Sequence, residues 1–146
     1  MSVKTILKGK TGDLVTCRSE HMMETVATLL TTHRIGALPV CDGGRKLVGI
    51  ISERDIVGNM AKAGAGVMKM KVRDVMTKKV VVCGPEDSIK DVMELMDRRH
   101  IRHLPVLEDD KLVGIISQRD VMAHRLKETE LETNVLRDHV RVGKAV

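Results

Sequence analysis

The chain has 146 residues, which suits one domain or two small units that share a core. It contains no Phe, Tyr or Trp, and this excludes nucleic-acid platforms of stacked rings and aromatic cages for quaternary amines. The net charge of +5 favours anionic partners such as phosphates, but it is too small to indicate nucleic-acid binding by itself.

Three features predict a cytoplasmic protein. The longest apolar runs, such as Leu112–Ile116, are only as long as a strand, so we expect no membrane-spanning segment. The first residues lack the apolar core and small-residue cleavage site of a secretory signal. The cysteines, Cys17, Cys41 and Cys83, are odd in number and not paired in spacing, which predicts buried, reduced thiols.

The first half of the chain predicts a strand, a helix, a hairpin and a second helix. A short strand at Val15–Cys17 precedes a helix whose apolar stripe runs from Met23 to His33. A hairpin then pairs residues 37–41 with residues 46–52. The second helix begins after the last residue of this hairpin.

The second half predicts the same elements in the same order. A strand at Val80–Cys83 precedes a helix with an apolar stripe from Ile89 to Met96, for which Ser88 is a suitable N-cap. A hairpin pairs His103–Leu107 with Lys111–Ser117, and another helix follows it.

The two halves also share sequence. Leu47–Asp55 reads LVGIISERD and Leu112–Asp120 reads LVGIISQRD, which agree at eight of nine positions at an offset of 65. HRIGALPV (His33–Val40) faces RHIRHLPV (Arg99–Val106) at an offset of 66. A β-α-β-β-α unit of this size is too small to close a core alone, so we expect two units packed sheet to sheet with pseudo-twofold symmetry. The predicted fold class is α/β (α+β).

We expect four segments along the chain. The first unit, with its N-terminal segment, covers residues 1–66, and a linker covers residues 67–71. The second unit covers residues 72–127, and residues 128–146 form a helical extension or a frayed, charged tail.

These motifs resemble the CBS (cystathionine β-synthase) domain family, whose tandem pairs are also called Bateman modules. Ile35–Val40 with Leu47–Asp55 carries the resemblance, and Ile101–Val106 with Leu112–Asp120 repeats it, so that it covers about residues 3–127. The resemblance implies a regulatory module that binds an adenosyl ligand such as AMP, ADP, ATP, NAD or S-adenosylmethionine. It also implies a disc-like homodimer that acts on a regulated protein.

Four candidate ligand residues lie where a strand passes into a helix. Ser52 with Asp55, and Ser117 with Asp120, have the spacing of a capping box, which by itself explains both pairs. The matching CBS motifs instead put a ribose on Asp55 and Asp120, beside a helix N-terminus that favours a phosphate. Both interpretations stay open at this point.

The basic candidate ligand residues follow the capping serines or lie at the start of a strand. Arg54 and Arg119 come after the caps, where a guanidinium can reach a phosphate or remain solvated. Alternation along the strand directs His103 toward the cleft or the core. The resemblance supports His103 and Arg102 as phosphate ligands.

The first half departs from the second at these positions. Gly36 and Ala37 replace Arg102 and His103, which predicts two unequal clefts. Ala37 leaves room for the flat face of an adenine. That face is bounded on the flanking strands by Val15 or Thr16, or by their counterparts Val81 and Val82, unless these residues are plain core.

The sequence therefore predicts a non-enzymatic module that binds an adenine nucleotide between its repeats and reports cellular energy state. The alternative is a structural or protein-interaction dimer with vestigial clefts. Nucleic-acid binding through Arg98–His103 ranks behind both. Cys17 and His21 lack a second metal-binding pair, and Ser117 lacks a nucleophile elbow, so we expect neither a metal site nor catalysis.

Overall fold

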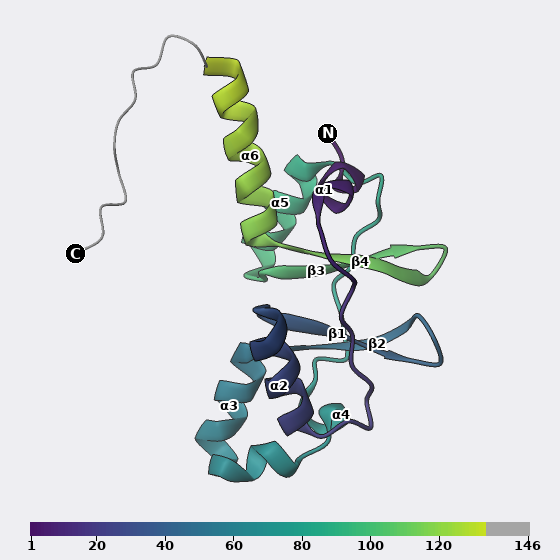
Figure 1. The fold of residues 1–146 in the computed structure, drawn as a ribbon, viewed down its shortest axis with the longest axis vertical. Coiled ribbons are helices and arrows are strands. Elements are labelled where there is room, and N and C mark those ends of the chain that lie inside the picture. The colour runs from purple at the N-terminus through teal and green to yellow at the C-terminus, as the bar shows by residue number, and fades with distance from the viewer. Residues whose placement is uncertain (134–146) are drawn as a thin grey trace, which may run out of the picture.

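The computed structural model describes residues 1–133, which form two similar units (Figure 1). The first unit contains α2 (Met23–His33), β1 (Ala37–Asp42), β2 (Lys46–Ser52) and α3 (Glu53–Ala63). The second contains α5 (Ile89–Arg99), β3 (His103–Glu108), β4 (Lys111–Ser117) and α6 (Gln118–Thr133). The short helices are α1 (Val3–Gly9), the 3-10 helix η1 (Gly64–Lys69) and α4 (Val72–Val75). The predicted order of helices and hairpins is confirmed in both halves, and the fold class is α+β.

The two hairpins meet in the middle of the molecule. Figure 1 shows β3 and β4 facing β1 and β2, with the larger helices on the outer sides. β2 and β4 are in contact, and the backbone N–H of Leu112 donates to the carbonyl of Arg45 across the boundary at 3.0 Å. The predicted packing of sheet against sheet is therefore confirmed, and a cleft between the units becomes possible at each end.

The two predicted N-terminal strands are reduced to single bridges. Cys17 pairs in parallel with Val40, and Cys83 pairs in the same way with Val106. The next parallel hydrogen bond toward the N-terminus would need the N–H of Pro39 or of Pro105, which proline lacks. The ladder therefore stops after one bridge in each unit.

The segment that precedes each unit completes the core of the other unit. Val3 and Ile6 of α1 are buried in the same cluster as Ile116 of the second unit. Val72 and Val75 of α4 are buried with the core of the first unit. Figure 1 shows the same exchange, because α1 lies beside α5 and α6 while α4 lies near α2 and α3. The N-terminal segment, which comes first in the chain, thus packs on the second unit.

The glycine of the repeated LVGIIS motif leaves space for the segment that crosses each unit. A Cβ built at Gly49 would lie 2.5 Å from Sδ of Met76, and one at Gly114 would lie 2.7 Å from Cδ2 of Leu7. Both glycines therefore lie directly beneath a crossing segment. A larger residue there would push that segment away from the sheet.

The three cysteines are buried and none forms a disulfide. Burial raises the pKa of Cys17 and of Cys83 to about 12, so these thiols stay protonated at neutral pH. Within residues 1–133, no helix combines the length and apolar character needed to cross a bilayer. α6 continues past Lys127 to Thr133, and the rest of the expected extension, residues 134–146, lies outside the described residues.

Candidate functional site

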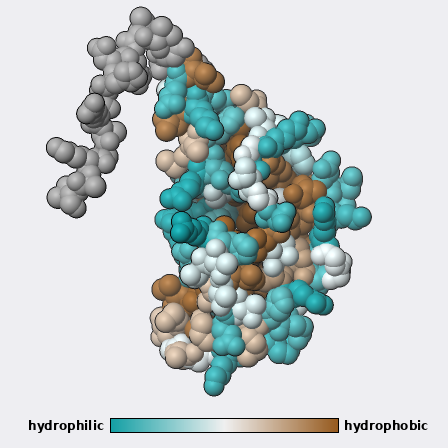
Figure 2. Space-filling model, viewed as in Figure 1, coloured by the Kyte–Doolittle hydropathy of each residue, from teal (hydrophilic) through white to brown (hydrophobic). Residues whose placement is uncertain are grey.

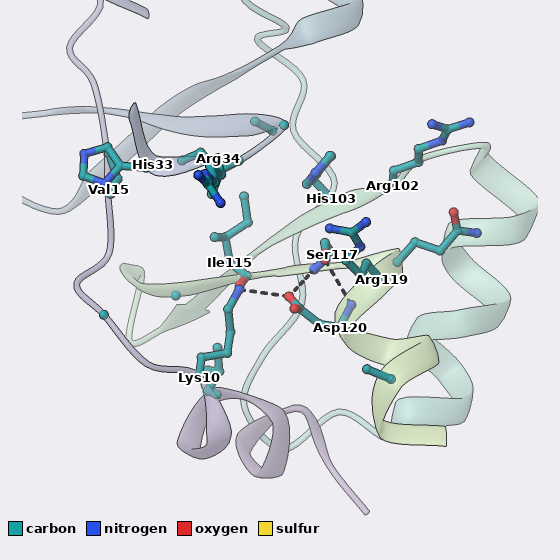
Figure 3. A pocket seen from close by; sticks show the side chains of 18 of the residues that line it. Lys10, Val15, His33, Arg34, Arg102, His103, Ile115, Ser117, Arg119 and Asp120 are labelled. Carbon is teal, nitrogen blue, oxygen red and sulfur yellow. Dashed lines mark hydrogen bonds and ion pairs between the residues drawn. The ribbon is translucent and has the colours of Figure 1, made fainter. Parts of the chain in front are cut away.

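The larger cavity lies between the two units and has a volume of about 1640 Å³ (Figure 3). The second unit forms one wall with β3, β4 and the start of α6, and the first unit forms the other with the end of α2 and Ala37. The segment from Lys10 to Val15 runs along the opening between them. The cavity therefore brings together residues that are far apart in the sequence.

A capping box fixes Asp120 at the edge of this cavity. Oδ2 of Asp120 accepts a hydrogen bond from the backbone N–H of Ser117 at 2.9 Å, and the Asp120 N–H donates to Ser117 Oγ at 3.1 Å. The N–H of Gln118 donates to the carbonyl of Arg102 at 2.8 Å, which ties the helix start to β3. The predicted cap is confirmed, and the same contacts hold the carboxylate beside the cleft.

Lys10 pairs with Asp120. Its Nζ donates to Oδ2 of Asp120 at 2.9 Å and to the carbonyl of Ile115 at 2.8 Å (Figure 3). Burial pushes the pKa of Asp120 upward, but hydrogen bonds from Lys10 and from Ser117 outweigh it and hold the pKa below its ordinary value. Asp120 is therefore ionised at neutral pH.

Sequence reasoning missed Lys10. The segments that precede the two units correspond at an offset of 69, which pairs Lys10 with Lys79. This offset differs from that of the repeated motifs, so none of those motifs marks the lysine. It comes from the C-cap of α1, which reaches the site only because α1 packs on the second unit.

His103 extends from β3 across to the first unit. A Cβ built at Gly36 would lie 3.3 Å from both Cε1 and Nε2 of the His103 imidazole. Gly36 stands where the second unit has Arg102, so the first unit lacks that cation. The absence of a side chain at Gly36 also makes room for His103 of the second unit.

The pKa of His103 lies below its ordinary value. Burial is the main cause. Glu53 and Asp120 act against this lowering, whereas Lys10 and Arg102 add to it. The imidazole is accordingly neutral at neutral pH and can gain a proton when a negative charge arrives beside it.

A smaller cavity of about 280 Å³ lies at the equivalent place in the first unit and shares His103 and Arg102 with the larger one. Here the N–H of Ser52 donates to Oδ2 of Asp55 at 2.8 Å, and the Asp55 N–H donates to Ser52 Oγ at 3.4 Å. No ion pair to Asp55 occurs within residues 1–133. The two clefts are thus unequal in size and in charge.

Most candidate residues gather at the two cavities. The larger one is lined by Ala37, Arg102, His103, Ser117, Arg119 and Asp120. The smaller one is lined by Ser52, Arg54, Asp55, Arg102 and His103. Thr16 and Val82 line neither cavity, whereas their neighbours Val15 and Val81 do.

Positive charge predominates around the larger cavity. Its cationic lining residues in the described part of the chain are Lys10, Arg34, Arg102, Arg119 and Arg125, and its acidic ones are Asp13, Glu53 and Asp120. Counting the histidines as neutral, this leaves an excess of two positive charges. Such a site favours a ligand that carries negative charge.

Comparison with known proteins identifies the repeats. The model of the CBS domain matches residues 3–62 and 72–127. The CBS domain-containing protein CBSX3, mitochondrial, of Arabidopsis thaliana is 32% identical over 142 residues, which cover 93% of this chain and 69% of that protein. Two other curated relatives are longer, and the chain spans 35% and 22% of their lengths.

Two solved structures show how the fold is shared. The CBS-domain protein ATU1752 from Agrobacterium tumefaciens matches with a TM-score of 0.81 and 38% identity, over 86% of this chain and 99% of that one. The CBS domain pair of MJ0100, solved with 5′-methylthioadenosine and S-adenosyl-L-methionine, matches with a TM-score of 0.77 and 27% identity, over 88% and 98%. A structural neighbour with this fold therefore binds adenosyl ligands.

Proposed function

The chain belongs to the CBS domain family, and from this premise we propose that it is a regulatory module that binds a phosphorylated adenosine ligand in its larger cleft. Asp120 carries the proposal, because it is buried in part, ionised, and fixed at the wall of a cavity formed by both units. A carboxylate in this position can accept hydrogen bonds from both hydroxyls of a ribose. Its Oδ2 is engaged by Ser117 and Lys10, and Oδ1 remains for the sugar.

The charge of the cleft favours a phosphate on the ligand. Arg102 and Arg119 line the cavity beside Asp120, and guanidinium groups bind phosphate in a fork geometry. 5′-Methylthioadenosine is uncharged and S-adenosylmethionine carries a cationic sulfonium, so the excess positive charge disfavours them relative to AMP, ADP, ATP or NAD. Ala37 is buried in the opposite wall, where it leaves space for the base.

A ligand in this cleft contacts both units, so it stabilises the relative packing of the units that it fits best. AMP, ADP and ATP differ in the number of phosphates. A cleft that binds them with different affinities would report cellular energy state to a regulated protein.

Titration calorimetry of the wild-type chain tests the proposal. We expect AMP, ADP, ATP or NAD to bind in the micromolar range, which corresponds to about −8.2 kcal/mol at 1 µM, and to raise the melting temperature. 5′-Methylthioadenosine and S-adenosylmethionine, tested at the same concentrations, should bind more weakly. Binding of none of the six compounds would contradict the proposal and favour a structural module with vestigial clefts.

The affinity for AMP should rise as the pH falls from about 8 to about 6.5. The lowered pKa of His103 leaves its imidazole neutral in the free protein, and a bound phosphate would raise that pKa again. Binding then takes up a proton, so by linkage a lower pH favours it. Calorimetry in buffers of different ionisation enthalpy measures this uptake at pH 7.5, where the phosphate, with a pKa of about 6, is already almost fully dianionic.

His103→Gln is the matched control, because glutamine keeps a hydrogen-bonding group and cannot take up the proton. The variant should bind AMP without the proton uptake of the wild type. Equal proton uptake by both proteins would assign the pH dependence to another group.

We also propose that the chain pairs with a second copy through α3 and α6. None of the residues of α3 is buried in the single chain, although α2 and α5 each bury three. Val57 of α3 and Met122 of α6 occupy equivalent positions at the repeat offset of 65, and they are 65% and 62% exposed. Figure 2 shows apolar surface over both helices along one side of the molecule. Exposed apolar side chains gathered on one surface are typical of an interface.

A further inference from the structure

The ammonium group of Lys10 is held in place at the mouth of the larger cleft. Burial of Val3 and Ile6 anchors α1 on the second unit, and Leu7 lies over Gly114. The chain leaves α1 at Lys10, whose backbone N–H donates to the carbonyl of Leu7 at 3.2 Å. The side chain is therefore directed along β4 toward Asp120 by a fixed backbone (Figure 3).

Two of the three N–H donors of this ammonium are used inside the protein. They go to Oδ2 of Asp120 at 2.9 Å and to the carbonyl of Ile115 at 2.8 Å. The third is left for another acceptor. The side chain of Lys10 is 38% exposed and that of Asp120 is 24% exposed, so a molecule in the cleft can reach both groups.

The pairing changes what Asp120 presents to a ligand. Without Lys10, a ligand whose ribose lies on this carboxylate would bring its phosphate close to an uncompensated negative charge. With Lys10 present, the pair is neutral and a donor faces the same space. Within residues 1–133, Lys10 is the one cation in an ion pair with Asp120.

The smaller cleft provides a comparison inside the same chain. Lys79 stands at the position equivalent to Lys10 and lines the smaller cleft, but within residues 1–133 it forms no ion pair with Asp55, whose carboxylate contacts Ser52. The ion pair with a lysine is therefore not needed for the capping box. Among the described residues, the ion pair with the capping carboxylate occurs at the larger cleft alone, which points to a role in what that cleft binds.

We propose that Lys10 is a specificity-determining residue that makes the larger cleft prefer a phosphorylated adenosine over an uncharged one. It stays paired with Asp120, and its remaining N–H donates to a phosphate oxygen of the ligand. This inference rests on the proposed function. It adds a residue from outside the repeated motifs as the group that selects for charge.

The test compares AMP with adenosine, which differ only in the phosphate, on four proteins by titration calorimetry. These are the wild type, Lys10→Met, Lys10→Arg and Lys8→Met. Methionine is unbranched like lysine but carries no charge, and Lys8 is an exposed lysine on the same helix. A charge-assisted hydrogen bond is lost only in Lys10→Met, so the ratio of AMP to adenosine affinity should fall about 10-fold or more there. It should stay near the wild-type ratio in Lys10→Arg and Lys8→Met.

The two proposals fail in different ways. If the wild type binds AMP and Lys10→Met keeps the same ratio of affinities, the role of Lys10 is wrong while the proposed function stands. If the wild type binds neither AMP nor any other adenosyl compound, the proposed function fails and this inference fails with it. Thermal melts of all four proteins show whether a lost signal comes from unfolding, and Lys10→Arg then decides whether charge at this position restores selection.

Discussion

Asp120→Asn should weaken the binding of AMP by about 10- to 100-fold, because a charge-assisted hydrogen bond to the ribose is lost. Asparagine has nearly the same shape, and its amide oxygen can still accept the hydrogen bond from the Ser117 N–H. It removes the negative charge that pairs with Lys10 and would receive the ribose hydroxyls. Titration calorimetry with AMP measures the change.

Asp55→Asn is the matched control for this variant. Asp55 has the same capping contacts with Ser52, but it faces the smaller cleft, which has a volume of about 280 Å³. Both variants therefore change the same position of a capping box, so any effect of the cap on stability is present in each. If AMP binds to the larger cleft, only Asp120→Asn should reduce its affinity strongly. Equal affinities in Asp120→Asn and the wild type would contradict the proposed ribose contact.

The double variant Val57→Asp, Met122→Asp should convert a dimeric protein into a monomer. Both side chains lie on the apolar surface of α3 and α6, and a twofold interface brings each new carboxylate close to others of the same sign. Like charges forced together at an interface cost several kcal/mol, so we expect the dissociation constant of the dimer to rise about 100-fold or more. Sedimentation velocity over a range of concentrations measures the effect.

Thr32→Asp is the control, because Thr32 is exposed on α2, which is not one of the two helices of the proposed interface. It should leave the dimer intact. A wild-type chain that sediments as a monomer at all concentrations would contradict the dimer, as would a double variant that dimerises like the wild type. Circular dichroism of the double variant establishes that the monomer is still folded.

The proposed ligand site and the proposed interface share one element, α6. Asp120 lies in its first turn at the cleft, and Met122, two residues later, lines the same cavity and is largely exposed. A nucleotide that shifts the start of α6 would therefore also shift the surface offered to a second copy. This connection gives the module a physical route from ligand binding to a change in assembly.

The sequence by itself determined the elements and their duplication. Alternation and turn residues predicted both hairpins, and the apolar stripes predicted α2 and α5, because these signals depend on residues only a few positions apart. The capping boxes of Asp55 and Asp120 follow in the same way, since their partners lie three residues away. The repeated motifs were sufficient to indicate the CBS family.

The tertiary structure alone decided how the larger cleft is completed. Lys10 and Asp120 are 110 residues apart and belong to no common motif, so nothing in the sequence pairs them. The structure also decided that α1 packs on the second unit and that Val15, not Thr16, faces the cavity. Such contacts depend on which apolar faces pack against each other, and those faces come from distant parts of the chain. Local sequence limits what an element can be, but the charge of the site depends on where the packing of α1 places a lysine.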